Sequence, residues 1–167
     1  MTFRRSFRRA VRLAGFSAAL AVLAGCGHSK PSTADVLNVE AKLPADMPVP
    51  ALDWRTVTSS VDRAHGTMAM LTTNDKAIFY AGSGNYPAGS VLALTTWLQR
   101  DDPHWFGARI PGTLVSLETV TMEATADGKV TATYKRYAGN PLRDVTDNSS
   151  AESRKAAIVA MRYAPMP

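Results

Sequence analysis

Cysteine is almost absent from this chain of 167 residues, in which Cys26 stands alone. A single thiol excludes an intramolecular disulfide and any zinc site built on paired cysteines. Histidine is also scarce: His28, His65 and His104 are the only three, and no His-x-x-x-His spacing or dense carboxylate cluster accompanies them. Neither a phosphate-binding glycine loop nor a Gly-x-Ser-x-Gly motif is present. We therefore expect no structural metal, and the spacings identify no catalytic residue.

Acidic residues are missing from the first 25 positions, which carry five arginines followed by the apolar run Leu13–Leu23. A basic start before such a run is typical of an export signal, and the run is too short to span a bilayer. The sequence Leu23-Ala24-Gly25-Cys26 is similar to the lipobox of bacterial lipoproteins, in which the cysteine is acylated and the chain is cut just before it. We predict a signal peptide over residues 1–25 and lipid, such as palmitate, on Cys26.

Lipid on Cys26 implies anchoring in the bacterial cell envelope, with the chain facing the periplasm. Several acyl chains hold a protein stably because each buried methylene contributes about 0.8 kcal/mol. Gly27 after the lipid-bearing cysteine, rather than Asp, resembles the pattern sorted to the outer membrane. Arg4-Arg5-Ser6-Phe7 partly matches the twin-arginine export pattern, so that export route stays open beside the general one.

Excess positive charge is missing from the chain once the signal is removed. The full chain has 19 Lys+Arg and 14 Asp+Glu, and subtracting the five signal arginines (19 − 5 = 14) leaves the two signs balanced. The high sequence pI, near 9.6, therefore belongs to the segment that is cut off. Because nucleic-acid binding proteins carry their basic residues in the mature domain, we predict no nucleic-acid partner.

The 142 residues that follow the signal (167 − 25 = 142) suffice for one domain. Residues 26–50 contain four prolines and no sustained apolar period, which predicts a flexible tether after the lipidated cysteine. His28 lies in this tether, and we interpret it as a solvated linker residue. The folded domain is expected over residues 51–167.

Residues 65–72 and 90–98 are rich in apolar and β-branched side chains, which predicts two strands. Residues 54–61 stay ambiguous, because their apolar spacing is near-helical whereas their β-branched and serine content favours a strand. Thr73-Asn74-Asp75 offers capping side chains for a short helix that Gly82 would end.

The stretch 113–137 predicts a β-hairpin. Its turn is expected at Asp127-Gly128, a pair favoured in two-residue turns because both central positions need positive φ. Along the first strand the apolar residues change parity between Leu117 and Val120. A bulge near Glu118-Thr119 would account for this change.

Ser149-Ser150-Ala151-Glu152 fits a capping box at the start of a helix that ends before Pro165. Ile158 and Met161 would share its apolar face. Together these elements predict the α+β class, an antiparallel sheet of about four or five strands with two or three packed helices.

The stretch DDPHWFGARIPG contains the strongest candidate for a ligand contact, His104. Trp105 and Phe106 could pack on a flat ligand, and the guanidinium of Arg109 could pair with a carboxylate. Alternatively, the rings close a sheet edge and Arg109 pairs with one of the two aspartates that open the stretch. The sequence leaves both interpretations open.

A second candidate is His65, which precedes a glycine at the start of a predicted strand. It is either a surface histidine in a turn or a side chain that points into a pocket. Asp101 and Asp102 do not suggest acid–base chemistry, because adjacent side chains normally point apart, and we expect two exposed carboxylates.

Four motifs occur in a recognisable order: Trp54-Arg55, His65-Gly66-Thr67, Asn74-x-x-Ala77 and Tyr86-Pro87-Ala88-Gly89-Ser90. In that order they resemble the cytochrome P-460 domain family, which includes the cytochromes c-prime-beta, over about residues 52–137. The resemblance implies a periplasmic, largely antiparallel β domain with helices that holds haem on its sheet. Tyr86 lies in the most specific motif. The candidate cofactor contacts are therefore His104, His65, Trp105, Arg109 and Tyr86.

Covalent c-type haem needs Cys-x-x-Cys-His, and this chain has neither a second cysteine nor a histidine after His104. No haem-attachment residue is carried over from the family. We expect an envelope lipoprotein that binds a small ligand or non-covalent haem. Two alternatives stay open, a cofactor-free structural or protein-interaction lipoprotein and a haem-dependent redox protein acting on small nitrogen compounds. The missing motif counts against the last, so an enzymatic role is not favoured.

Overall fold

The computed structural model describes residues 37–163, apart from the side chain of Leu52. Within this range the folded unit begins at Asn38. The predicted signal peptide, Cys26, His28 and Pro165 lie outside the described residues.

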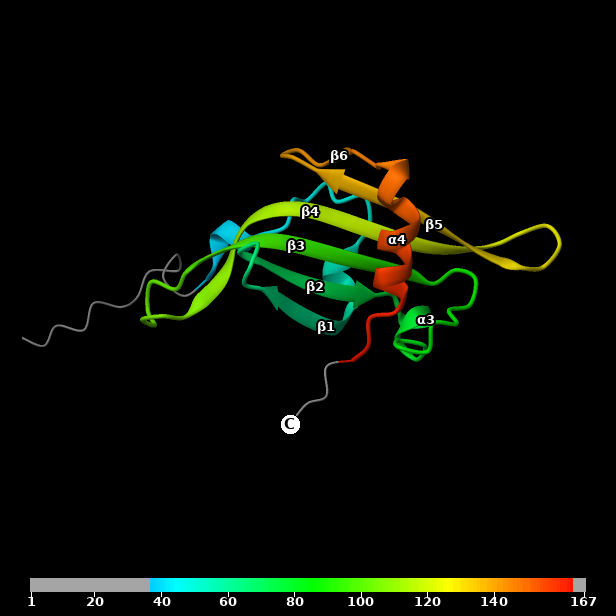
Figure 1. Cartoon of the computed structure of the whole chain (residues 1–167), viewed down its shortest axis with the longest axis horizontal. Helices are drawn as coiled ribbons and strands as arrows, with labels where there is room; N and C mark the ends of the chain where they lie inside the picture. The colour runs from blue at the N-terminus through cyan, green and yellow to red at the C-terminus, as the bar shows by residue number, and fades with distance from the viewer. Residues whose placement is uncertain (1–36, 164–167) are drawn as a thin grey trace, which may run out of the picture. The chain divides into compact units, whose positions relative to one another are not determined.

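Six antiparallel strands form one sheet, in which their spatial order follows their order in the sequence (Figure 1). This arrangement confirms the α+β class with an antiparallel sheet, although the strands number more than the four or five predicted. None of the described helices is long and apolar enough to cross a bilayer. The strands are β1 (Arg55–Asp62), β2 (Thr67–Thr73), β3 (Val91–Asp101), β4 (Arg109–Ala124), β5 (Val130–Ala138) and β6 (Arg143–Asp144).

Helical segments precede, interrupt and follow the strands. Between residues 37 and 163 they are two 3-10 turns, η2 (Val39–Ala41) and η3 (Ala51–Asp53), and two helices, α3 (Asp75–Ile78) and α4 (Asn148–Val159). The segment that stayed ambiguous in the sequence, residues 54–61, forms β1, as its β-branched content favours.

The antiparallel order places the turns alternately at two ends of the sheet. The β1–β2 turn and the β3–β4 loop lie at one end, and the β2–β3 connection and the β4–β5 turn lie at the other (Figure 1). Side chains from the first end therefore do not meet side chains from the second.

The β4–β5 turn differs from the predicted two-residue turn. Among the described residues only glycines have positive φ, so Asp127 does not, whereas Gly128 has φ +80°. Thr125 N donates to Lys129 O at 2.8 Å and Gly128 N donates to Thr125 O at 2.9 Å. This is a longer loop with one glycine in the left-handed region, a geometry in which the aspartate keeps negative φ.

The register shift in β4 lies between Pro111 and Ser116, not at Glu118-Thr119 as predicted. Glu118 and Thr119 pair regularly with both β3 and β5. The parity change has another cause: Leu117 and Val120 are both fully buried, but they face opposite sides of the sheet.

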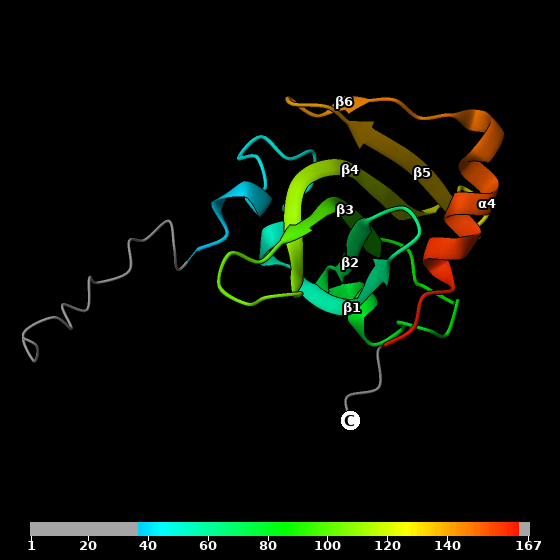
Figure 2. The same cartoon turned by 60° about the vertical axis from the view of Figure 1, so that its left-hand side comes forward.

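Two separate hydrophobic clusters lie on the two faces of the sheet. Figure 2 shows α4 and the N-terminal segment on opposite sides of β4. The cluster under α4 comprises Val57, Leu71, Ala77, Ile78, Tyr86, Leu92, Leu94, Val120, Met122, Tyr134 and Ile158. The cluster under the N-terminal segment comprises Ala51, Ala93 and Leu117, with Met47, Val49, Trp54, Tyr137 and Leu142 packed against them.

The N-terminal segment corrects the predicted tether over residues 26–50, because residues 38–50 belong to the folded unit. Trp97 Nε1 donates to Ala41 O at 3.1 Å, and Leu43 is buried. The prolines prevent a helical or strand period in this segment, but isolated apolar side chains between them still cover a sheet face.

Caps set the starts of both helices. Asn74 Oδ1 accepts from Ala77 N at 3.2 Å, so Asn74 is the cap of α3 among the three candidates Thr73, Asn74 and Asp75. In α4 the cap is Asp147, whose Oδ1 accepts from Ser149 N at 2.9 Å, and not Ser149 as predicted. Aspartate is as good a cap as serine, and it lies where the chain enters the helix. Ile158 is fully buried, as the apolar pattern predicted.

Candidate ligand-binding site

The structure places His65 in the β1–β2 turn, where its side chain is exposed. Its Nδ1 lies 2.7 Å from Asp62 Oδ2, and its backbone N donates to Asp62 Oδ1 at 3.0 Å. The hydrogen bonds to His65 hold the pKa of Asp62 below its ordinary value. His65 therefore ties the turn to the end of β1, and it does not line the pocket beside α4.

His104, Trp105 and Arg109 lie in or beside the β3–β4 loop, at the same end of the sheet as His65. Arg109 Nε lies 3.2 Å from Asp101 Oδ1, as one of the two sequence interpretations expected. The other part of that interpretation is wrong: Trp105 is 72% exposed and Phe106 is fully exposed, so neither ring closes a sheet edge.

Tyr86 lies at the opposite end of the sheet, in the connection between α3 and β3, and it is buried. The five candidate contacts therefore divide into four exposed residues at one end and one buried residue at the other. They do not form one binding site.

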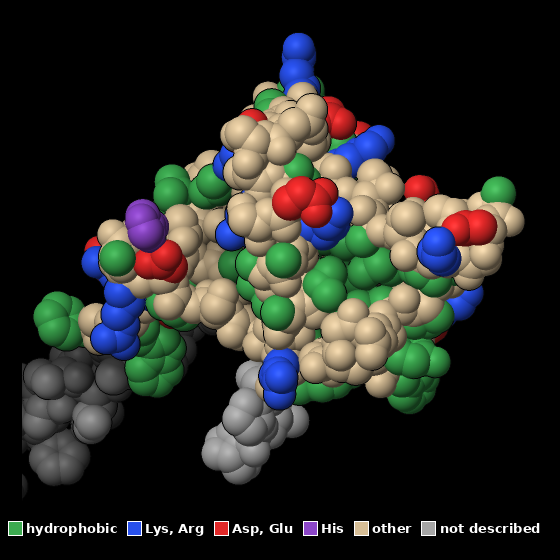
Figure 3. Space-filling model, turned by 45° about the vertical axis from the view of Figure 1, so that its right-hand side comes forward, with side chains coloured by type: hydrophobic (Ala, Val, Ile, Leu, Met, Phe, Trp, Pro, Cys, Tyr) green, Lys and Arg blue, Asp and Glu red, His purple; other side chains and the backbone are tan. Residues whose placement is uncertain are grey.

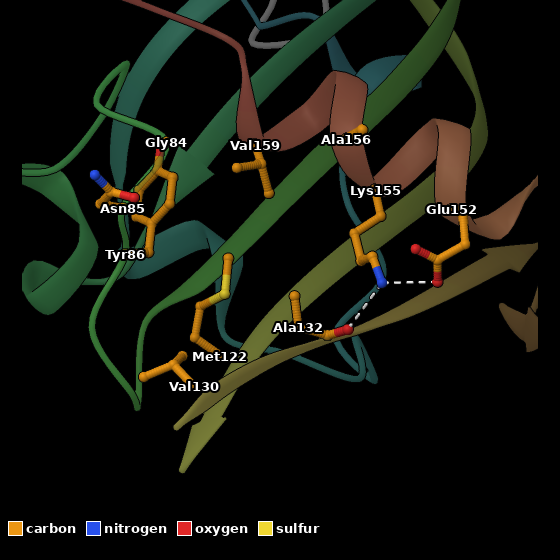
Figure 4. A pocket seen from close by; sticks show the side chains of 10 residues that line it. All are labelled: Gly84, Asn85, Tyr86, Met122, Val130, Ala132, Glu152, Lys155, Ala156 and Val159. Atoms are coloured by element: carbon orange, nitrogen blue, oxygen red, sulfur yellow. Dashed lines mark hydrogen bonds and ion pairs between the residues drawn. The ribbon is translucent and has the colours of Figure 1, made fainter. Parts of the chain in front are cut away.

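Tyr86 does line a pocket, which opens between α4, the α3–β3 connection and the β4–β5 hairpin (Figure 4). The cavity has a volume of about 370 Å³, within the range of small-molecule sites. In Figure 3 a hydrophobic area on this side of the molecule is bordered by acidic and basic side chains. The lining residues are Gly84, Asn85, Tyr86, Met122, Val130, Ala132, Glu152, Lys155, Ala156 and Val159.

The pocket combines an apolar floor with a charged rim. Met122, on β4, is buried and belongs to the core under α4. At the rim, Lys155 Nζ lies 2.7 Å from Glu152 Oε1 and donates to Ala132 O at 3.3 Å (Figure 4). A ligand with an apolar body and a polar end would match both parts.

The Tyr86 hydroxyl is a buried polar group that no described residue satisfies. The Gly82 backbone lies near this hydroxyl but not in the geometry of a hydrogen bond. Burial raises the pKa of Tyr86 above its ordinary value. Unsatisfied buried hydroxyls are unusual, and because this one is shielded from solvent, a water or a ligand group would bind it only after the wall of the pocket rearranges.

An ion pair between a buried carboxylate and a half-buried guanidinium holds α4 against the sheet beside the pocket. Glu118, only 3% exposed, accepts from Arg154 Nε at 2.9 Å and from Arg154 Nη2 at 2.6 Å. Tyr134 donates its hydroxyl to the same carboxylate at 2.5 Å. Because a buried charge is costly unless it is paired, this three-residue network fixes where α4 can lie. It thereby fixes the helical wall of the pocket.

The protonation of this network follows from its contacts. Burial by itself would raise the pKa of Glu118, but the hydrogen bonds from Arg154 and Tyr134 outweigh it and hold that pKa below its ordinary value. Burial and the neighbouring carboxylate raise the pKa of Tyr134 to about 12. Glu118 is therefore ionised and Tyr134 neutral near neutral pH.

Sequence analysis did not identify Glu118, Arg154 or Lys155. The signal for Glu118 was present, because it is a charged residue between the apolar Leu117 and Val120 of the predicted strand, and a charged residue buried there requires a partner. Nothing local indicates that the partner is 36 positions away.

Residues 37–163 contain no group of three or more His, Cys, Asp or Glu side chains that could hold a metal ion. No histidine lines the pocket, and both described histidines lie at the other end of the sheet. The pocket therefore does not fit haem held by histidine.

A search of protein-family models finds none that matches this chain, and a search of curated proteins finds no significantly similar sequence.

Proposed function

We propose that this chain is a bacterial envelope lipoprotein, held by lipid on Cys26 and facing the periplasm, whose domain binds a small amphiphilic ligand. One observation carries the proposal of ligand binding: the pocket beside α4 combines apolar side chains with a charged rim. The lipid on Cys26 is supported by the lipobox-like sequence alone.

The chemistry of the rim defines the class of ligand. Lys155 already pairs with Glu152, whose side chain is 83% exposed and therefore weakly held. An anionic group on the ligand would compete with Glu152 for the ammonium. The ligand is thus a compact molecule with an apolar body and one anionic end.

The resemblance to the cytochrome P-460 family supports a periplasmic β domain but not its cofactor. The pocket offers no histidine, and His65 and His104 lie too far away to supply one. We therefore propose neither haem binding nor a redox reaction at this site.

The test uses an amphiphilic probe, 1-anilinonaphthalene-8-sulfonate, with the chain that starts after Cys26. The change Ala156→Trp places a large ring in the pocket, and we expect it to weaken saturable probe binding by about tenfold or more. Ala157→Trp is the matched control, because Ala157 is the exposed neighbour on the same helix and does not line the pocket. Its affinity is expected to equal that of the wild type.

Amide chemical shifts locate the probe independently of the mutations, and Ala132 and Val159 are expected to shift most. The proposal fails if the wild type shows no saturable binding, or if Ala156→Trp binds as tightly as Ala157→Trp. A folded wild-type chain that binds no small molecule would favour the cofactor-free, protein-interaction alternative.

A further inference from the structure

The β3–β4 loop presents two large rings to solvent at its tip. Trp105 is 72% exposed and Phe106 is fully exposed, although aromatic rings are normally buried. In Figure 3 large hydrophobic side chains protrude on the left, the side to which this loop runs in Figure 1. No part of the molecule described by the structure covers them.

The loop is compact and holds the rings outward. Asp102 N donates to Ala108 O at 3.0 Å, and Ala108 N donates to Trp105 O at 3.0 Å. The ion pair between Asp101 and Arg109 closes the loop at its base. The rings are therefore presented by an ordered turn, which lowers the entropy lost when a partner covers them.

The start of the folded unit is fastened to the same hairpin. Asn38 Nδ2 donates to Pro111 O at 2.6 Å, and Arg100 Nη2 donates to Asn38 Oδ1 at 2.9 Å. Glu40 adds an ion pair to Arg100 at 3.1 Å and accepts from Thr113 Oγ1 at 3.1 Å. The chain therefore leaves the folded unit, toward Cys26, from the hairpin that carries Trp105.

The connection to the lipid is short. Twelve positions separate Cys26 from Asn38 (38 − 26 = 12). Even fully extended, twelve residues reach only about 40 Å. A lipid on Cys26 thus keeps the β3–β4 hairpin close to the membrane surface in which that lipid is embedded.

We infer that the tip of the β3–β4 loop inserts into the interfacial region of the phospholipid bilayer that holds the lipid anchor. This inference rests on the proposed lipid attachment at Cys26. Tryptophan is enriched at this depth of a membrane because its ring is apolar and its N–H is polar. Phe106 adds apolar area beside it.

Charge does not drive this insertion. The loop from Asp101 to Arg109 carries two carboxylates and one guanidinium, so it has no basic surface that would attract anionic lipids. Two rings alone bind a bilayer weakly, and the anchor raises their effective concentration at the surface. Insertion is therefore expected in the anchored chain, on zwitterionic and anionic membranes alike.

The experiment measures tryptophan emission of the full lipidated chain in phosphatidylcholine vesicles that contain brominated phosphatidylcholine. Because bromine quenches only rings within the bilayer, we expect the Trp105 contribution to fall about twofold or more. Trp105→Phe is expected to abolish the quenching. Trp54→Phe is the matched control and is expected to retain it, because Trp54 packs against the core cluster under the N-terminal segment.

Two further measurements separate this inference from the proposed function. Mass spectrometry of the membrane-extracted chain shows whether Cys26 carries lipid. If it does not, the anchor proposal fails, and coupling the lone thiol to a maleimide-bearing phospholipid still tests the loop. Brominated lipid that leaves Trp105 unquenched in an anchored chain overturns the inference. The inference is also overturned if Trp105 stays accessible to aqueous iodide in the anchored chain. The exposed rings are then a protein-contact surface.

Discussion

The two faces of the sheet are covered by different kinds of chain. Under α4 the cover is a regular helix of twelve residues, fixed by Ile158 in the core and by the Glu118–Arg154 ion pair. On the other face the cover is a proline-rich segment that contains only two 3-10 turns. Hydrogen bonds from side chains of the sheet, such as Trp97 to Ala41 O, replace the internal hydrogen bonds that a helix would have.

This difference shows that an apolar period in a sequence indicates a regular helix or strand, but does not indicate an irregular segment that packs on a sheet. Between Ser116 and Val120 every residue of β4 is buried, because both covers meet this strand. A strand buried on both faces loses its alternation of apolar and polar residues. The parity change between Leu117 and Val120 therefore marks the position where the apolar side chains of β4 pass from the face under the N-terminal segment to the face under α4.

The largest effect on the α4 side of the sheet is expected from truncating Ile158, the side chain of α4 that is buried in the core. We expect Ile158→Ala to lower the free energy of unfolding by about 3–4 kcal/mol, because Ile158 is fully buried and leaves a cavity. Urea denaturation measures the loss. The control Val145→Ala changes an exposed side chain and should cost less than about 0.5 kcal/mol. Equal losses in the two variants would mean that α4 does not depend on its core contact.

The ion pair under α4 provides the second test. Glu118→Gln keeps the shape of the side chain but leaves Arg154 without its charge partner, and we expect a loss of about 2–3 kcal/mol. This lies at the low end for buried pairs because the Arg154 side chain is 43% exposed and can be rehydrated. Glu123→Gln, on an exposed position of the same strand, is the control.

The ion pair also predicts a dependence on pH. The folded-state pKa of Glu118 lies below its ordinary value of 4.5, so its contribution is fully present above about pH 4.5 and is lost as the pH falls through the lowered pKa. The difference in stability between wild type and Glu118→Gln should therefore shrink as the pH falls below that value. A difference that stays constant with pH would show that the pair contributes through shape and not through charge.

The smallest expected effect concerns residues 38–50, the proline-rich segment that covers the other face of the sheet. Leu43→Ala should destabilise the domain by about 2 kcal/mol, because Leu43 is buried but close to the surface. Val39→Ala, in the same segment, removes a side chain that is 61% exposed and should have little effect. If both variants unfold like the wild type, residues 38–50 behave as the tether that the sequence predicted.

Much of the fold was predictable from local signals. The β-branched runs that became β2 and β3, the cap at Asn74 and the glycine of the β4–β5 turn each act within a few residues. The strand count was too low because β1 has an ambiguous pattern and β6 has only two residues. The candidate site was less predictable, and of the five contacts proposed from the sequence only Tyr86 lines the pocket.

What the sequence by itself determined is the class of the domain and the position of most strands, since each depends on neighbouring residues. The tertiary structure alone decided three other features. It seats residues 38–50 on the sheet, pairs Glu118 with Arg154 and assembles the pocket around Tyr86. The physical reason is that these features depend on contacts between residues far apart in the chain, and no local period or propensity specifies such partners.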